Sequence, residues 1–102
     1  MGYLYDKMQT MMKIYGLAER TQEHYLKEML KFTKFFNISP DKLTHDHIYQ
    51  YQSYLVNDKK VGYSSFRIMV NSLRFFYNKV MGYDWMIKYI PYQKKDLNYQ
   101  PF

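Results

Sequence analysis

Apolar residues recur along this chain at the three- and four-residue spacing of helices that bury one side. Sparse glycine, proline and polar turn residues divide the pattern into four blocks, each about 13 to 19 residues long, a length typical of helices. The chain has no sustained alternation of apolar and polar residues, and it contains no Asn-Gly or Asp-Gly pair that would indicate a hairpin. The pattern therefore predicts an all-α fold with four main helices.

We expect these helices over residues 3–15, 18–36, 44–57 and 64–81. Gly16 and Gly82 are natural stops, because glycine readily adopts the left-handed backbone that ends a helix. Thr44 is a good N-cap for the third helix, whereas the cap of the second is open between Ala18 and Thr21. The fourth helix is expected to begin at Ser64 or the serine after it.

Each predicted helix carries a stripe of apolar residues that should face a common core. These residues are Leu4, Met8, Met11, Met12 and Tyr15; Tyr25, Met29, Phe32 and Phe36; Ile48, Tyr51 and Leu55; and Phe66, Met69, Val70, Leu73, Tyr77 and Val80. From Tyr83 the helical rhythm is lost, and the segment contains Pro91, Pro101 and the pair Lys94 and Lys95. We therefore predict a helical domain over residues 1–82 and an extended tail or linker over residues 83–102.

Composition narrows the class of protein. A chain of 102 residues that is 47% hydrophobic is large enough for one domain with a real core. Cysteine is absent, which excludes disulfides and thiolate metal sites. No apolar run approaches the roughly 18–20 residues that span a bilayer, and charged residues interrupt the first twenty positions, unlike a secretory signal. We expect a soluble, cytoplasmic domain.

The net charge of +6 and the pI of about 9.4 favour a polyanionic partner, nucleic acid first and an anionic membrane surface second. In the second helix, four cations fall within a sector of about 60°, opposite Tyr25 and Phe32. We call them the basic stripe: Arg20, Lys27, Lys31 and Lys34. A merely solvated face is the alternative interpretation.

A second polar face, on the fourth helix, is more specific. We call it the Arg/Asn stripe: Arg67, Asn71, Arg74 and Asn78. No acidic residue occurs between Asp58 and Asp84, and arginine and asparagine suit phosphates and base edges. Ser64 and Ser65 add hydroxyls at the start of this helix, where backbone N–H groups attract phosphate. Together the two stripes predict a paired nucleic-acid surface; the alternative is a capped helix whose arginines pair with carboxylates.

Signals of catalysis or of a cofactor are weak. His45 and His47 could touch a metal, but residues two apart on a helix do not share a face, and no further histidine or cysteine supports them. The sequence contains no glycine-rich phosphate loop, paired-carboxylate motif or H-E-x-x-H motif. We therefore expect no metal, no cofactor and no enzymatic activity from this chain.

Three segments in order resemble the N-terminal core-binding domain of tyrosine recombinases, the phage-integrase family. They are GLAERTQEHYLKEMLKFTKFF (residues 16–36), LTHDHIYQYQSYL (residues 43–55) and YSSFRIMVNSLRFFYNKVMG (residues 63–82). The matching positions are Thr21, Tyr25 and Phe32; Leu43, Thr44 and Ile48; and Ser65, Leu73, Arg74, Phe76 and Tyr77. The tail YIPYQKKDLNYQP (residues 89–101) is similar to the linker that leads to the catalytic domain.

The resemblance implies a four-helix orthogonal bundle with a SAM-like fold, which forms half of a clamp around double-stranded DNA in integration and recombination. Its second and fourth helices would face the DNA. Arg67, Asn71 and Arg74 would contact the groove; Arg20, Lys27, Lys31 and Lys34 would serve phosphates, with Thr21, Ser64 and Ser65 near the helix ends. The catalytic domain of the parent recombinase and neighbouring protomers on DNA would be partners.

Two departures from the family pattern matter. Ala18 stands where the family usually has serine or another capping residue. The family's catalytic residues, including an H-x-x-R motif, lie in a following domain, and this chain has no H-x-x-R, since Lys27 follows His24 by three. The resemblance therefore implies a piece that binds DNA without cutting it.

A small helical protein–protein interaction module is the alternative function, with Met8, Met11 and Met12 as its candidate apolar groove. A membrane-surface bundle is disfavoured because the apolar faces are needed for a core. A helix-turn-helix regulator is disfavoured because the connections are too long for the tight turn of that motif.

Overall fold

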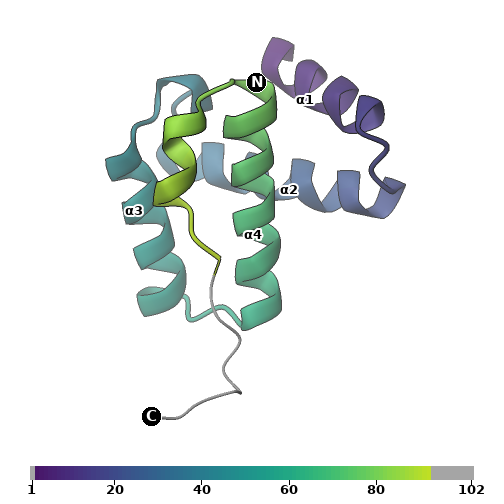
Figure 1. The fold of residues 1–102 in the computed structure, drawn as a ribbon. Helices are drawn as coiled ribbons and strands as arrows, with labels where there is room; N and C mark the ends of the chain where they lie inside the picture. The colour runs from purple at the N-terminus through teal and green to yellow at the C-terminus, as the bar shows by residue number, and fades with distance from the viewer. Residues whose placement is uncertain (1, 93–102) are drawn as a thin grey trace.

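The computed structural model describes residues 2–92, and it is built from helices (Figure 1). The main helices are α1 (Gly2–Ile14), α2 (Glu19–Phe36), α3 (His45–Ser53) and α4 (Tyr63–Phe75). α3 and α4 each continue into a π-helical turn, η2 (Tyr54–Asp58) and η3 (Phe76–Val80) respectively. Counted together with these π-helical turns, the four helices are as predicted, with shifts of one residue at their ends; α4, for example, begins at Tyr63 rather than at a serine.

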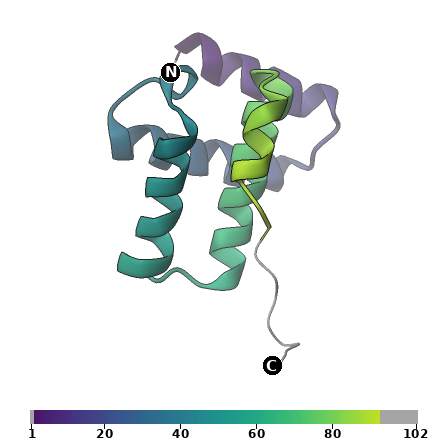
Figure 2. The same cartoon turned by 60° about the vertical axis from the view of Figure 1, so that its left-hand side comes forward.

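α3 and α4 run side by side in opposite directions, and α2 crosses behind both of them (Figures 1 and 2). α1 lies across one end of this arrangement, next to α2 and η3. A short 3₁₀ turn, η1 (Pro40–Lys42), connects α2 to α3. Within residues 2–92, none of the helices combines the length and the apolar character needed to cross a membrane.

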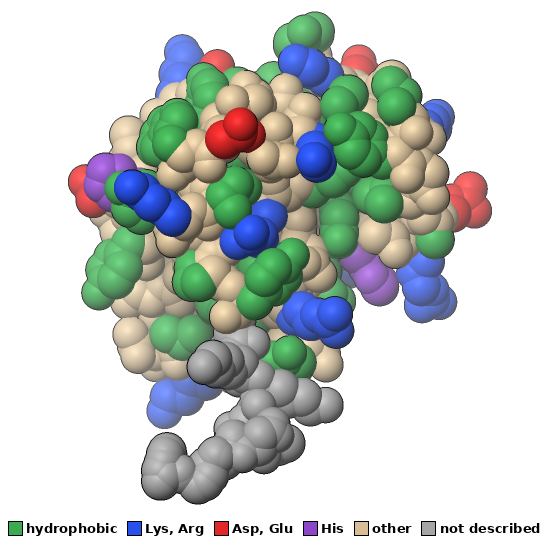
Figure 3. All heavy atoms as spheres, in the orientation of Figure 1, with side chains coloured by type: hydrophobic (Ala, Val, Ile, Leu, Met, Phe, Trp, Pro, Cys, Tyr) green, Lys and Arg blue, Asp and Glu red, His purple; other side chains and the backbone are tan. Residues whose placement is uncertain are grey.

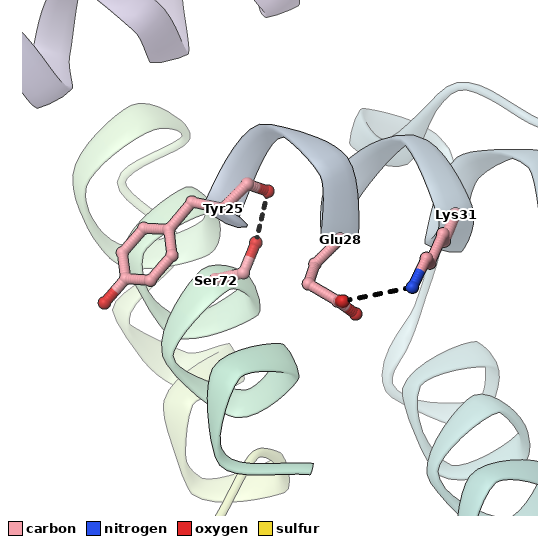
Figure 4. Close-up of polar contacts among 4 residues, drawn as sticks. All are labelled: Tyr25, Glu28, Lys31 and Ser72. Atoms are coloured by element: carbon pink, nitrogen blue, oxygen red, sulfur yellow. Dashed lines mark hydrogen bonds and ion pairs between the residues drawn. The ribbon is translucent and has the colours of Figure 1, made fainter. Parts of the chain in front are cut away.

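The core lies where α2 crosses the pair, and all six residues predicted for the stripe of the fourth helix are buried in it. Phe32 of α2 packs edge-on against Tyr51 of α3, with ring centroids 5.0 Å apart. Ser72 Oγ donates a 2.8 Å hydrogen bond to the carbonyl of Tyr25, which ties α4 to α2 inside the apolar contact (Figure 4). This bond satisfies a buried hydroxyl that would otherwise be costly.

Helix ends follow the local chemistry. Gly16 has a φ of +69°, the left-handed conformation expected after α1. Ala18 is the N-cap of α2, without a side-chain hydrogen bond. At α3, the backbone N–H of Thr44 donates to Nδ1 of His47 at 3.0 Å, so His47 takes the place of the usual glutamate in a capping box.

Met8 and Met12 of α1 are fully buried in this core. The Met-rich face proposed above as an exposed groove for a protein partner is therefore packing surface. This correction removes the sequence feature that favoured a protein–protein module.

The expectation of an extended tail from Tyr83 is wrong for its first part. Asp84–Tyr89 form a 3₁₀ helix, η4, which packs against α3 and η3. Met86 and Ile90 are fully buried and anchor it to the core. Two apolar anchors are too few to show as a periodic pattern. Residues 93–102, with the predicted pair Lys94 and Lys95, lie outside the described residues.

Candidate nucleic-acid interface

The four cations of the basic stripe are exposed along α2, and Thr21 beside them is half-buried. On the other side of the helix, the ring of Tyr25 packs against Phe75 of α4, and Met29 is buried in the core. Because helical residues on opposite sides point in opposite directions, the stripe faces away from α4. Lys31 Nζ lies 3.4 Å from a carboxylate oxygen of Glu28, an exposed pair worth little in water (Figure 4).

The Arg/Asn stripe has a different environment. Arg67 is exposed, but Asn71, Arg74 and Asn78 are half-buried. Arg74 Nη1 donates to the carbonyls of Ile87 at 3.3 Å and Ile90 at 2.7 Å. Its guanidinium also lies 4.6 Å from the ring centroid of Tyr92. Arg74 therefore holds η4 and the residues after it against α4.

Asn78 makes a second link to the same segment. Its Nδ2 donates to a carboxylate oxygen of Asp84 at 2.8 Å. No carboxylate lies within one helical turn of the stripe in the sequence. The carboxylate that Asn78 contacts belongs to η4, which the fold brings next to it.

Arg67 lies within electrostatic reach of Tyr25 on α2. Burial is the main cause that raises the pKa of Tyr25, and the nearby Tyr92 adds to it. The positive charge of Arg67 offsets part of that rise, because it favours the ionised phenolate. Ser64 and Ser65 are exposed in the first turn of the same helix.

The two stripes do not form the single paired surface predicted from the sequence, because the basic stripe faces away from α4 and each stripe lines a different hollow. Asn71, Arg74 and Lys79 line one of about 340 Å³, together with Tyr25 and Tyr92. The other, of about 280 Å³, has Lys31, Lys34 and Lys59 on its walls. On the face shown in Figure 3, Lys and Arg side chains stand apart with apolar side chains between them.

Lys59 and Lys79 were missed by the helical pattern. Lys59 follows η2, outside any helix, so no periodicity marks it. Lys79 is in the π-helical turn η3, and its ammonium lies 5.4 Å from the ring centroid of Tyr15, just after α1. In the folded chain, Lys59 lines the same hollow as the basic stripe, and Lys79 lines the same hollow as the Arg/Asn stripe.

His45 and His47 serve separate local roles at and near the start of α3. His47 caps α3 through the backbone of Thr44. His45 stacks on the ring of Tyr89 with centroids 4.6 Å apart. In the part of the chain that the structure describes, no three histidine or acidic side chains gather as metal ligands would.

Comparison with known proteins gives the chain a family. Residues 4–87 match the family described as "Phage integrase, N-terminal SAM-like domain". A curated protein of Sinorhizobium fredii named "Putative integrase/recombinase y4qK" is 33% identical over 93 residues, which are 90% of this chain and 30% of that relative. No solved structure matches. Because the matched residues cover most of the sequence, this chain belongs to the family of phage integrase N-terminal SAM-like domains.

Proposed function

We propose that this chain binds duplex DNA as the core-binding part of a tyrosine recombinase that acts in DNA integration and recombination. The observation that carries the proposal is a set of four exposed cations along one helix of a domain in the phage-integrase family. Proteins that neutralise phosphates with such side chains gain affinity by releasing counterions.

The basic stripe is the proposed phosphate surface. Arg20 and Lys34 are fourteen residues apart, so the stripe is roughly 21 Å long at the rise of an α-helix. Duplex DNA carries about one charge per 1.7 Å of its axis, so roughly a dozen phosphates lie along that length. Thr21, Ser64 and Ser65 are proposed as further phosphate contacts from helix ends.

Arg67 and Asn71 are the proposed base contacts, because guanidinium and amide groups can read base edges in the major groove. Arg74 was predicted to join them. Its Nη1 is already bonded to two carbonyls, so we assign its main role to positioning η4 beneath this surface.

Strand cleavage is proposed to belong to residues outside this chain. The chain spans 30% of the length of its Sinorhizobium relative, and the H-x-x-R motif of the catalytic domain does not occur in it. A catalytic domain and neighbouring protomers on DNA are therefore the proposed partners.

The experiment is a titration of labelled duplex DNA with the 102-residue chain at several salt concentrations. If about four to six phosphates are neutralised, log K falls with log salt at a slope near −4 to −5. Replacing Lys27 and Lys34 together by alanine should reduce that slope by about 2, and Lys13→Ala on α1 is the matched control. Arg67→Ala should cost about 1–3 kcal/mol and blur sequence preference. Absence of duplex binding at low salt, or binding independent of salt, would contradict the proposal.

A further inference from the structure

Phe35 is an exposed aromatic residue next to the basic stripe. Its side chain is 43% exposed, whereas Phe32 on the same helix is fully buried. Its ring packs against Tyr54 of η2, with centroids 4.8 Å apart, and edge-on against Tyr51 at 5.2 Å. Part of the ring is thus fixed in place by its neighbours while the rest faces water.

Three lysines line the same hollow as this ring. Lys31 and Lys34 come from α2 and Lys59 from the end of η2, and all three line the hollow of about 280 Å³ that Phe35 and Tyr54 also line. The carboxylate of Glu28 neutralises part of the charge, because it pairs with Lys31. Lys34 and Lys59 remain as exposed positive side chains in the lining of the same hollow as the rings.

A single exposed phenylalanine is common on protein surfaces and needs no explanation. A supported ring in one hollow with lysines from two separate elements is a different arrangement, because it offers a stacking surface and phosphate partners together. That combination is how proteins bind single-stranded nucleic acid. Bases inside a duplex are stacked on one another and cannot reach a ring in a hollow.

We propose that the hollow between α2 and η2 binds an unpaired base of single-stranded nucleic acid, with the base stacked on Phe35 and the flanking phosphates held by Lys34 and Lys59. This goes beyond the proposed function, which requires only duplex DNA. Lys31 and Lys34 belong to both surfaces, whereas Phe35 belongs to the hollow alone.

The test measures binding of labelled oligothymidine and oligouridine, about twelve nucleotides long, to the full chain at low salt. Phe35→Leu should weaken binding of single strands about tenfold and leave duplex binding unchanged, because leucine preserves apolar contact but cannot stack. Phe35→Trp should bind at least as tightly as the parent. Tyr3→Leu, which removes another exposed ring, on α1, is the matched control and should change nothing.

Lys59→Ala should weaken binding of single strands several-fold and reduce the salt slope by about 0.7, with Lys13→Ala as its control. The DNA and RNA oligonucleotides distinguish the two sources of an unpaired base. A 2-aminopurine base in the oligonucleotide reports stacking directly, and its fluorescence should fall on binding to the parent chain. This last measurement decides the question even if Phe35→Leu melts early in circular dichroism.

Equal affinity of the Phe35→Leu variant and the parent for single strands would overturn the proposal, as would unchanged 2-aminopurine fluorescence in the bound state. An acidic peptide can also be added as a competitor of the single strand. If it displaces the strand equally well from the parent and from the Phe35→Leu variant, the hollow is a general polyanion surface and the proposal is overturned. Loss of single-strand binding with intact duplex binding separates this proposal from the function proposed above.

Discussion

The basic stripe on α2 and the Arg/Asn stripe on α4 and η3 have similar helical spacing in sequence but different surroundings in the structure. The four cations of the first are exposed. In the second, Arg74 and Asn78 are half-buried and hydrogen-bonded to the segment that contains η4. A polar stripe thus shows which side of a helix avoids the apolar core, but it does not show whether that side meets water or another part of the chain.

The chemistry of the side chains explains the difference. A lysine ammonium is compact and strongly hydrated, so it is stable on an open face. The guanidinium of Arg74 has several donors in one plane, so one nitrogen can bond to the carbonyls of Ile87 and Ile90. On α4 these donors hold backbone in place, whereas on α2 the charges remain available for a ligand.

The largest expected effect concerns the core under both stripes. Burial raises the pKa of Tyr51, which packs against α2, to about 12, and the Glu28 carboxylate adds to the rise. Burial also raises the pKa of Tyr77 in the π-helical turn after α4, with Asp41 adding to it. An unfolded tyrosine loses its proton near pH 10, so stability is complete below that pH and falls as the pH rises further.

Tyr51 alone should account for up to about 3 kcal/mol of this loss, spread over the range between pH 10 and 12. Urea unfolding followed by circular dichroism at several pH values measures it. In the Tyr51→Phe variant, the free energy of unfolding should fall less between pH 10 and 12, by the amount attributed to Tyr51. A decline equally steep in Tyr51→Phe would show that the core beneath α2 is open to water.

Arg74→Ala should destabilise the fold by about 2 kcal/mol, because it leaves the carbonyls of Ile87 and Ile90 without their charged donor. Lys27→Ala on the exposed stripe should change stability by less than about 0.5 kcal/mol. Urea unfolding compares the two variants. Trp85 in η4 is the only tryptophan, so its fluorescence reports whether this segment detaches first. Equal stability of the two variants would remove the distinction between the stripes.

Much of the fold could be predicted from the sequence, because the signals were long or chemically distinct. The six apolar positions of the fourth helix correctly predicted which side of it is buried, and Thr44 correctly predicted where α3 begins. η4 could not be predicted, because it is short and is held by Met86, Ile90 and contacts from distant residues. The hydrogen-bond partners of Arg74 could not be predicted either, because they are backbone carbonyls, which a pattern of side chains does not indicate. The assignment of individual residues to DNA stays a prediction.

Asn78→Ala should have a smaller effect than Arg74→Ala, about 0.5–1 kcal/mol, because its bond to Asp84 is neutral on one side and exposed to water. The expected fall in melting temperature is a few degrees. Asn57→Ala is a useful control, because the amide of Asn57 donates a local hydrogen bond of 3.1 Å to the hydroxyl of Ser53, one helical turn earlier. If the two variants melt together, the contact with Asp84 contributes no more than a local one.

The smallest effect tests whether the basic stripe is as free as its exposure suggests. Lys31 is the member of the stripe whose ammonium lies 3.4 Å from a carboxylate, that of Glu28. A double-mutant cycle with Lys31→Ala and Glu28→Gln should give a coupling energy below about 0.5 kcal/mol, and added salt should reduce it further. A coupling well above 1 kcal/mol would mean that α2, like α4, uses its charge to hold the fold, and Lys31 would then be a poor donor to phosphate. A weak coupling leaves its ammonium able to exchange Glu28 for DNA at little cost, as a phosphate-binding surface requires.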